Sequence, residues 1–257
     1  MNSRVKSIHT RMPGISLPAF SSLTAFSRQA LDILLPPLCQ LCGAPSGEPS
    51  GDGALCAGCL ADLPGLPGNS CPVCLVATAR GERCGDCLYH PPAFTKAHAL
   101  YRYVFPLDHL IHALKYHAHL ALADSWGRRL AFLTADIEAD CVLPLPLHAG
   151  RIRERGYNQA LEIARALANT RGLMLDDKSL EKTRPTLPQT GLTLKARRKN
   201  PQGAFACDRD FSGQTLLLVD DVMTTGATCG EAARILKRNG AREVHVVVVA
   251  RAERHPF

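Results

Sequence analysis

Residues 216–228 read Leu-Leu-Leu-Val-Asp-Asp-Val-Met-Thr-Thr-Gly-Ala-Thr, and this stretch is the most informative about the fold. Its uninterrupted apolar run predicts a strand buried on both faces of a parallel sheet, and ligands bind such sheets at the carboxyl ends of the strands. A helical pattern follows over residues 229–239. A strand, a polar turn and a helix in succession therefore predict an α/β fold with a ligand site at the turn.

The polar turn carries groups that bind phosphate. The turn provides hydroxyl groups, backbone N–H groups at a helix start and a glycine that permits close approach of a ligand. The residues concerned are Thr224, Thr225, Gly226, Ala227 and Thr228. The carboxylates of Asp220 and Asp221 would repel phosphate, but they suit ribose hydroxyls or a bridging magnesium ion. The segment resembles the 5-phosphoribosyl 1-pyrophosphate (PRPP) motif of type I phosphoribosyltransferases. The alternative is a strand with an acidic end and a polar turn.

Apolar periodicity elsewhere supports the same fold class. It predicts helices over residues 106–117, 120–133 and 157–168, and strands over residues 141–147 and 244–249. The last strand forms a right-handed βαβ unit with the motif strand and its helix. We therefore expect a parallel sheet with helices on both faces.

Two basic segments precede the motif, and we expect both to be loops. The first, residues 151–159, contains Arg151 and Arg155 and follows a proline-rich strand end, where Arg side chains suit a pyrophosphate. The second, residues 189–200, suits either a bound phosphate or a nucleic-acid backbone. A solvated basic face is the alternative interpretation of both segments.

Eight of the 11 cysteines form four Cys-x-x-Cys pairs. They are Cys39 with Cys42, Cys56 with Cys59, Cys71 with Cys74, and Cys84 with Cys87. Such pairs are typical of zinc knuckles, so we expect two structural Cys₄ zinc sites. Sequential pairing of the knuckles is the simplest arrangement, and a cross-braced one remains open. A thioredoxin-like redox role is disfavoured because Pro and Gly flank the pairs.

The composition indicates a soluble globular protein of two units, with a formal charge of +7. All of the positive excess lies in residues 141–257, where 19 Lys and Arg face 12 Asp and Glu, which is consistent with an anionic ligand or a nucleic acid. We expect no membrane insertion and a cytoplasmic location, because neither a signal peptide nor a membrane span is evident. The expected division is an N-terminal extension with a docking helix over residues 1–35, a zinc module over residues 36–92, and the α/β domain over residues 98–257.

The order of the motifs resembles the ComF/GntX family of competence-associated proteins over about residues 30–252. After the four knuckles comes Leu-Lys-Tyr at 114–116, and then Pro-Leu-Pro-Leu-His at 144–148 followed by Arg-x-Arg-x-Arg-Gly-Tyr-Asn-Gln at 151–159. Pro-Gln-Thr-Gly-Leu at 188–192 and Arg-Arg-Lys-Asn at 197–200 come next, and the PRPP motif is last. The resemblance implies a double zinc ribbon ahead of a type I phosphoribosyltransferase fold. It also implies a link to DNA uptake or use, with competence or DNA-processing proteins as partners.

The resemblance also implies residue roles. Asp220 and Asp221 would hold the ribose hydroxyls and help to place magnesium, residues 224–228 would bind the 5′-phosphate, and Arg151 or Arg155 would approach the pyrophosphate. Purine phosphoribosyltransferases have an Asp where this chain has Thr224, and a hydroxyl is a poor general base, so purine salvage is disfavoured. The expectation is magnesium-dependent phosphoribosyl transfer from PRPP to an unknown acceptor. The alternative is a noncatalytic protein that binds single-stranded DNA or a partner through the same fold and zinc ribbons.

Overall fold

A computed structural model describes residues 36–47, 49, 51–186 and 200–253. The expected docking helix and residues 189–199 of the second basic segment lie outside the described residues. The chain divides between Pro37 and Leu38 into two units, and every element below belongs to the second of them, Leu38–Phe257.

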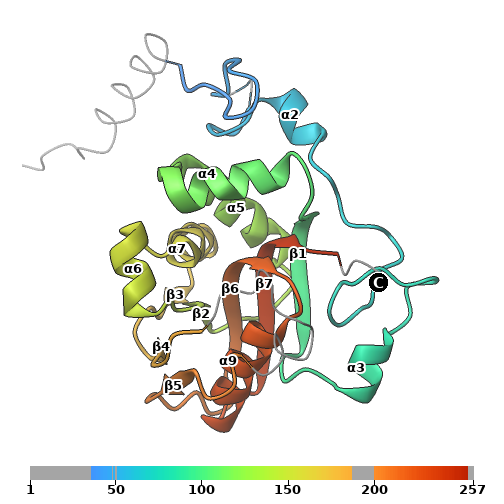
Figure 1. The fold of residues 1–257 in the computed structure, drawn as a ribbon, viewed down its shortest axis with the longest axis vertical. Helices are drawn as coiled ribbons and strands as arrows, with labels where there is room; N and C mark the ends of the chain where they lie inside the picture. The colour runs from blue at the N-terminus through green and yellow to red at the C-terminus, as the bar shows by residue number, and fades with distance from the viewer. Residues whose placement is uncertain (1–35, 48, 50, 187–199, 254–257) are drawn as a thin grey trace, which may run out of the picture. The chain divides into compact units, whose positions relative to one another are not determined.

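A five-stranded parallel sheet forms the centre of this unit (Figure 1). The strand order is β1-β7-β6-β2-β3, with the bounds β1 Lys96–Arg102, β2 Cys141–Pro144, β3 Met174–Leu175, β6 Thr215–Met223 and β7 Glu243–Arg251. The motif strand β6 is central, and its Leu218 is in register with Val246 on one side and Leu143 on the other. The sequence-based expectation of a buried parallel strand is confirmed.

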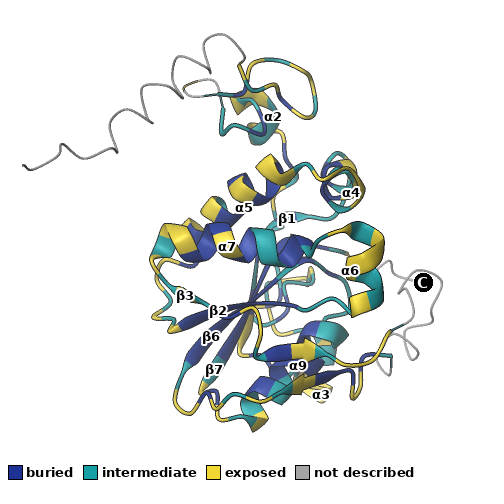
Figure 2. Ribbon diagram, turned by 90° about the vertical axis from the view of Figure 1, so that its left-hand side faces the viewer, coloured by how far each residue is buried: buried dark blue, intermediate teal, exposed yellow. Residues whose placement is uncertain are grey.

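Helices cover both faces of the sheet, as the apolar pattern predicts. Figure 2 shows α5 (Leu120–Leu133) and α7 (Gln159–Arg171) on one side and α9 (Ala227–Arg238) on the other. Because neighbouring side chains of a strand point to opposite faces, Leu217 and Val219 join the core under α4 (Leu107–His117), α5 and α7. Leu216 and Leu218 join the core under α9.

The zinc-ribbon segments contain two short helices, α2 (Ala57–Ala61) and α3 (Gly85–Tyr89). Cys39 belongs to the core on the α5 side of the sheet, whereas Cys71, Cys74 and Cys87 belong to the core on the α9 side. The two cysteine groups therefore pack on different faces of the α/β domain. No helix among the described residues is long and apolar enough to cross a membrane.

The structure differs from the sequence-based expectation at the first basic segment. Residues 149–155 form a helix, α6, where we expected a loop. The His148 side chain caps it by accepting a hydrogen bond from the Gly150 N–H at 3.2 Å, and Gly156 ends it in the left-handed conformation with φ of 85°. The expected strand over residues 141–147 is also shorter, because β2 ends at Pro144. The short antiparallel pair β4 (Leu180–Lys182) and β5 (Phe205–Cys207) had no counterpart in the expectation.

Candidate functional site

Two neighbouring cavities lie at the carboxyl end of β6. The larger has a volume of about 620 Å³ and extends between α4, α6 and β4. The smaller, of about 200 Å³, lies against the turn between β6 and α9. Lys115, Asp220 and Thr228 line both cavities, so the two share a boundary at Asp220, whereas Asp221 lines the larger cavity alone.

The turn of the motif connects the carboxyl end of β6 to the first turn of α9. Gly226 is the N-cap residue of α9 with φ of 78°, a conformation that a side chain disfavours, and Thr225 Oγ1 accepts a hydrogen bond from the Ala227 N–H at 3.3 Å. Thr224, Gly226 and Thr228 line the small cavity. Thr225 and Ala227 instead line a separate cavity on the other side of the turn. Of the five residues that we expected in one phosphate cup, the structure thus brings three to the cavity beside Asp220.

The acidic pair is tied to two neighbouring elements. Asp221, 4% exposed, accepts a hydrogen bond from Lys115 Nζ of α4 at 2.7 Å, and its Oδ2 lies 3.5 Å from Gln159 Nε2 of α7. The Asp221 N–H donates to Asp220 Oδ1 at 2.9 Å. Lys115 and Gln159 are site residues to which sequence reasoning gave no role, although both lie in motifs that carried the family resemblance.

The two carboxyl groups differ in acidity. Burial and the neighbouring Asp221 carboxylate raise the pKa of Asp220 well above its ordinary value. Burial acts to raise the pKa of Asp221 as well, but the charge and the hydrogen bond of Lys115, together with hydrogen bonds to Asp220 and to the Val222 N–H, hold that pKa below its ordinary value. Lys115 therefore neutralises the Asp221 carboxylate, whereas the Asp220 carboxyl group favours an external cation or a bound proton.

The predicted arginines line the larger cavity from α6. Arg155 donates to Gln159 Oε1 at 3.0 Å, and its guanidinium carbon lies 5.3 Å from the centroid of the Tyr116 ring. Arg151 forms an ion pair of 2.7 Å with Glu154 on the same helix. Arg155 is thus connected through Gln159 to the acidic pair, whereas the Arg151 side chain is 40% exposed and pairs with Glu154.

Lys182 of β4 is a further cation of the larger cavity, and nothing in the local sequence indicated it. Burial lowers its pKa, partly offset by the Asp220 carboxylate. Its ammonium group lies 5.7 Å from the centroid of the Phe205 ring. The larger cavity therefore combines cationic groups from α6 and β4 with the two carboxyl groups of β6.

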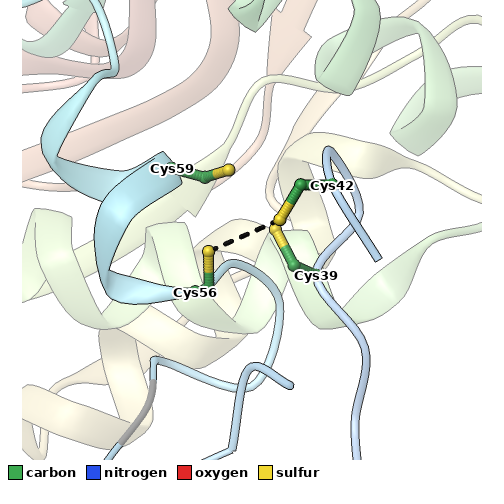
Figure 3. A group of neighbouring side chains, drawn as sticks. All are labelled: Cys39, Cys42, Cys56 and Cys59. Carbon is green, nitrogen blue, oxygen red and sulfur yellow. Dashed lines mark hydrogen bonds between the residues drawn. The ribbon is translucent and has the colours of Figure 1, made fainter. Parts of the chain in front are cut away.

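The eight cysteines of the Cys-x-x-Cys pairs form two groups of four, and the pairing is sequential. Figure 3 shows the first group. The groups are Cys39, Cys42, Cys56 and Cys59, and Cys71, Cys74, Cys84 and Cys87, with all sulfur atoms of a group within 4.8 Å of one another. The Cys42–Cys56 and Cys74–Cys84 sulfur distances are 3.6 Å, close to the roughly 3.8 Å that a tetrahedral zinc ion with 2.3 Å bonds requires. Both groups fit structural zinc ions with four protein ligands.

Comparison with known proteins agrees with this architecture. Residues 30–88 match the double zinc ribbon domain family, and residues 152–256 match the phosphoribosyl transferase domain family. The chain is 32% identical over 227 residues to DNA utilization protein YhgH of Escherichia coli O157:H7, covering 85% of this chain and 99% of that protein. It is 29% identical to Competence protein F of Haemophilus influenzae, covering 77% of this chain and 90% of that protein.

Among solved structures, glutamine PRPP amidotransferase from B. subtilis is 23% identical to this chain, with a TM-score of 0.35. The alignment covers 49% of this chain and 25% of the amidotransferase chain. The likeness to YhgH extends over both the cysteine-rich segment and the α/β domain. The chain therefore belongs to the ComF/YhgH family, whose members have a double zinc ribbon followed by a phosphoribosyltransferase domain.

Proposed function

We propose that the chain binds PRPP across the two cavities at the carboxyl end of β6. The 5′-phosphate occupies the small cavity beside Thr224, Gly226 and Thr228, where hydroxyls and the start of α9 offer donors. The ribose hydroxyls lie on Asp220, at the boundary of the cavities, and on Asp221, in the larger one. The observation that carries the proposal is the position of Asp220 between the two cavities, because PRPP requires a phosphate site and a cation-lined site on either side of its ribose.

The pyrophosphate would lie in the larger cavity, where Arg151 and Arg155 provide guanidinium groups. The acidic pair also fits a magnesium ion, since carboxylate oxygens are its preferred ligands and Asp220, whose pKa is raised by burial and by Asp221, forms no ion pair within 4 Å among the described residues. Asp220 would hold the ion, which would supply neutralisation of pyrophosphate charge. Asp221, already paired with Lys115, would keep its orientation for the ribose diol.

We propose phosphoribosyl transfer as the chemical use of this site. Pyrophosphate would leave the anomeric carbon through an oxocarbenium-like transition state as the acceptor attacks. Arg151 and Arg155 would stabilise the charge that develops on the leaving group, and Gln159 would fix the position of Arg155 through the hydrogen bond between them. Thr224, whose hydroxyl is a poor base, makes a purine acceptor unfavourable.

The experiment is a calorimetric titration of the zinc-replete protein with PRPP, with and without magnesium. Asp220→Asn/Asp221→Asn is expected to abolish magnesium-dependent binding while zinc content and circular dichroism stay unchanged. Asp124→Asn is the matched control, because Asp124 is an exposed carboxylate of α5 that pairs with Arg128 away from the cavities. Equal PRPP affinity in the wild type and the double variant would refute the assignment of the acidic pair.

The names of the relatives favour a second candidate, a role in DNA utilisation or competence that includes binding of single-stranded DNA. The arginines of α6 support DNA binding. Arg153 is exposed, and Arg151 and Arg155 line the larger cavity, so one helix provides guanidinium groups both to the solvent-exposed surface and to the PRPP site. Fluorescence anisotropy with a labelled oligonucleotide is expected to show affinity that falls with salt and is reduced by PRPP. DNA binding that PRPP leaves unchanged would contradict a shared site.

A further inference from the structure

Arg251, at the end of β7, joins the second cysteine group to the PRPP turn. The residue is 2% exposed, and its Nε donates to the carbonyl oxygen of Cys74 at 2.7 Å. Its Nη1 donates to the carbonyl oxygen of Met223 at 3.0 Å and also contacts that of Thr224. One buried guanidinium group therefore holds a zinc knuckle on one side and the start of the phosphate turn on the other.

A second set of contacts runs beside the first. The Ala97 N–H of β1 donates to the carbonyl oxygen of Val73 at 2.8 Å, which attaches the same knuckle to the sheet. Phe94, 4% exposed, packs beneath the turn, and a β-carbon added to Gly226 would lie 3.7 Å from its ring. The second cysteine group and the turn also enclose a cavity of about 430 Å³, lined by Cys74, Cys87 and Phe94 on one side and residues 225–227 on the other.

Charge adds to the connection. Among the described residues, the hydrogen bonds of Arg251 go to backbone carbonyl oxygens, and no carboxylate pairs with it. The Cys74 and Cys84 side chains are near enough to interact with it electrostatically. A zinc ion with four thiolates carries a net charge of −2, so the loaded centre supplies a counter-charge to the buried guanidinium group.

The first cysteine group is attached to a different element. Asp52, between Cys42 and Cys56, accepts hydrogen bonds from Ser125 and from Arg129, the latter at 3.3 Å, and both donors belong to α5. The protein thus contains two centres of the same chemistry, of which the second contacts the turn through Arg251. This difference provides an internal control.

We propose that the second zinc centre positions the phosphate turn, so that zinc binding by Cys71, Cys74, Cys84 and Cys87 and PRPP binding strengthen each other through Arg251. The inference rests on the proposed function, since it requires that PRPP occupies the turn. Coupling between two binding sites is reciprocal, so PRPP must raise the equilibrium zinc affinity of the second centre by the same factor by which that zinc improves PRPP affinity. We expect the higher zinc affinity to be expressed as slower release of zinc from that centre.

Zinc release to a chromogenic chelator tests this in the wild-type protein, with and without PRPP and magnesium. We expect two kinetic phases, assigned with Cys42→Ser and Cys71→Ser, each of which disrupts one centre. PRPP is expected to retard release from the second centre by about fivefold or more and to leave the first unchanged. Equal release from the second centre with and without PRPP, in protein that binds PRPP by calorimetry, would overturn the proposal.

Arg251→Lys tests the bridge itself, because an ammonium group keeps the charge but loses the planar fork that reaches both carbonyl groups. The retardation by PRPP is expected to disappear in this variant. Arg102→Lys is the matched control, since Arg102 is in register with Arg251 on β1 and donates to the Gly65 carbonyl oxygen, away from the turn. If Arg251→Lys retains the full effect, the bridge is refuted. Absence of PRPP binding to the zinc-replete wild type would instead refute the proposed function, and the coupling with it.

Discussion

Replacement of Lys115 by Met removes the cation that neutralises Asp221. The two side chains are 21% and 6% exposed and their charged atoms are 2.7 Å apart, so the variant leaves an almost fully buried carboxylate without its ion pair. Removing one partner of a buried pair costs about 3 to 5 kcal/mol of folding free energy, and the partial exposure of Lys115 favours the lower value of about 3 kcal/mol. For a chain of this size that corresponds to a decrease in Tm of roughly 6 to 12 °C.

The loss depends on pH, and its sign follows from the acidity of Asp221. In the wild type the pKa of Asp221 is depressed, so its stabilising effect is present above the pKa of the unfolded chain and is lost only as pH falls through the folded value. In Lys115→Met the burial remains while the lowering effect of Lys115 is gone, so the pKa of Asp221 rises relative to the wild type. The variant then gains stability relative to the wild type as pH falls and the carboxyl group takes up a proton.

Thermal unfolding of the zinc-replete proteins at about pH 8 and about pH 5.5 measures this difference. The deficit in Tm is expected to be larger at the higher pH. Lys178→Met, at an exposed lysine, controls for the loss of a surface charge and is expected to change stability by less than about 0.5 kcal/mol. A deficit that is the same at both pH values, or a variant as stable as the control, would refute the role of Lys115.

Three further predictions follow from the packing and the cysteine groups. Gly226→Ala places a side chain at φ of 78°, so we expect a loss of about 1 to 2 kcal/mol in stability and weaker PRPP binding by calorimetry; unchanged affinity would contradict the conformational requirement. Gly127→Ala places a β-carbon 2.4 Å from that of Ala166 where α5 meets α7, so we expect overpacking to cost about 1 to 3 kcal/mol of stability and to lower Tm. Gly230→Ala, in open space on α9, is expected to leave Tm unchanged. Equal Tm values for these two variants would contradict the close approach of α5 and α7. Removal of zinc by a chelator is expected to release two ions per chain and to lower Tm, and elemental analysis that finds fewer than two in the untreated protein would contradict the two Cys₄ sites.

The central strand and its turn could be predicted because their signals are continuous in sequence. β6 begins with the unbroken apolar run of residues 216–219, the helix that follows it has a periodic apolar pattern, and β7 contains a second continuous apolar run. The four Cys-x-x-Cys pairs are also short, continuous patterns, and their spacing is enough to predict zinc binding. Their sequential grouping needed the structure, because spacing alone allowed two arrangements.

The rest of the site could not be predicted because it depends on contacts between distant segments. Lys115 reaches Asp221 only after α4 packs beside the carboxyl end of β6, and the bridge from Arg251 to Cys74 joins residues that are 177 positions apart in sequence. α6 was expected to be a loop because seven mostly polar residues give no apolar stripe, and its helix depends on the His148 cap and Gly156. β1 was missed because its buried positions on alternate residues are mainly alanines, which give a weak apolar signal.

The most direct test of PRPP binding is a crystal structure of the zinc-replete protein with PRPP and magnesium. The account predicts the 5′-phosphate within hydrogen-bond distance of Thr224, Gly226 and Thr228, with the ribose diol on Asp220 and Asp221. A phosphate bound instead in the cavity between the second cysteine group and α9, on the opposite side of the turn, would contradict it.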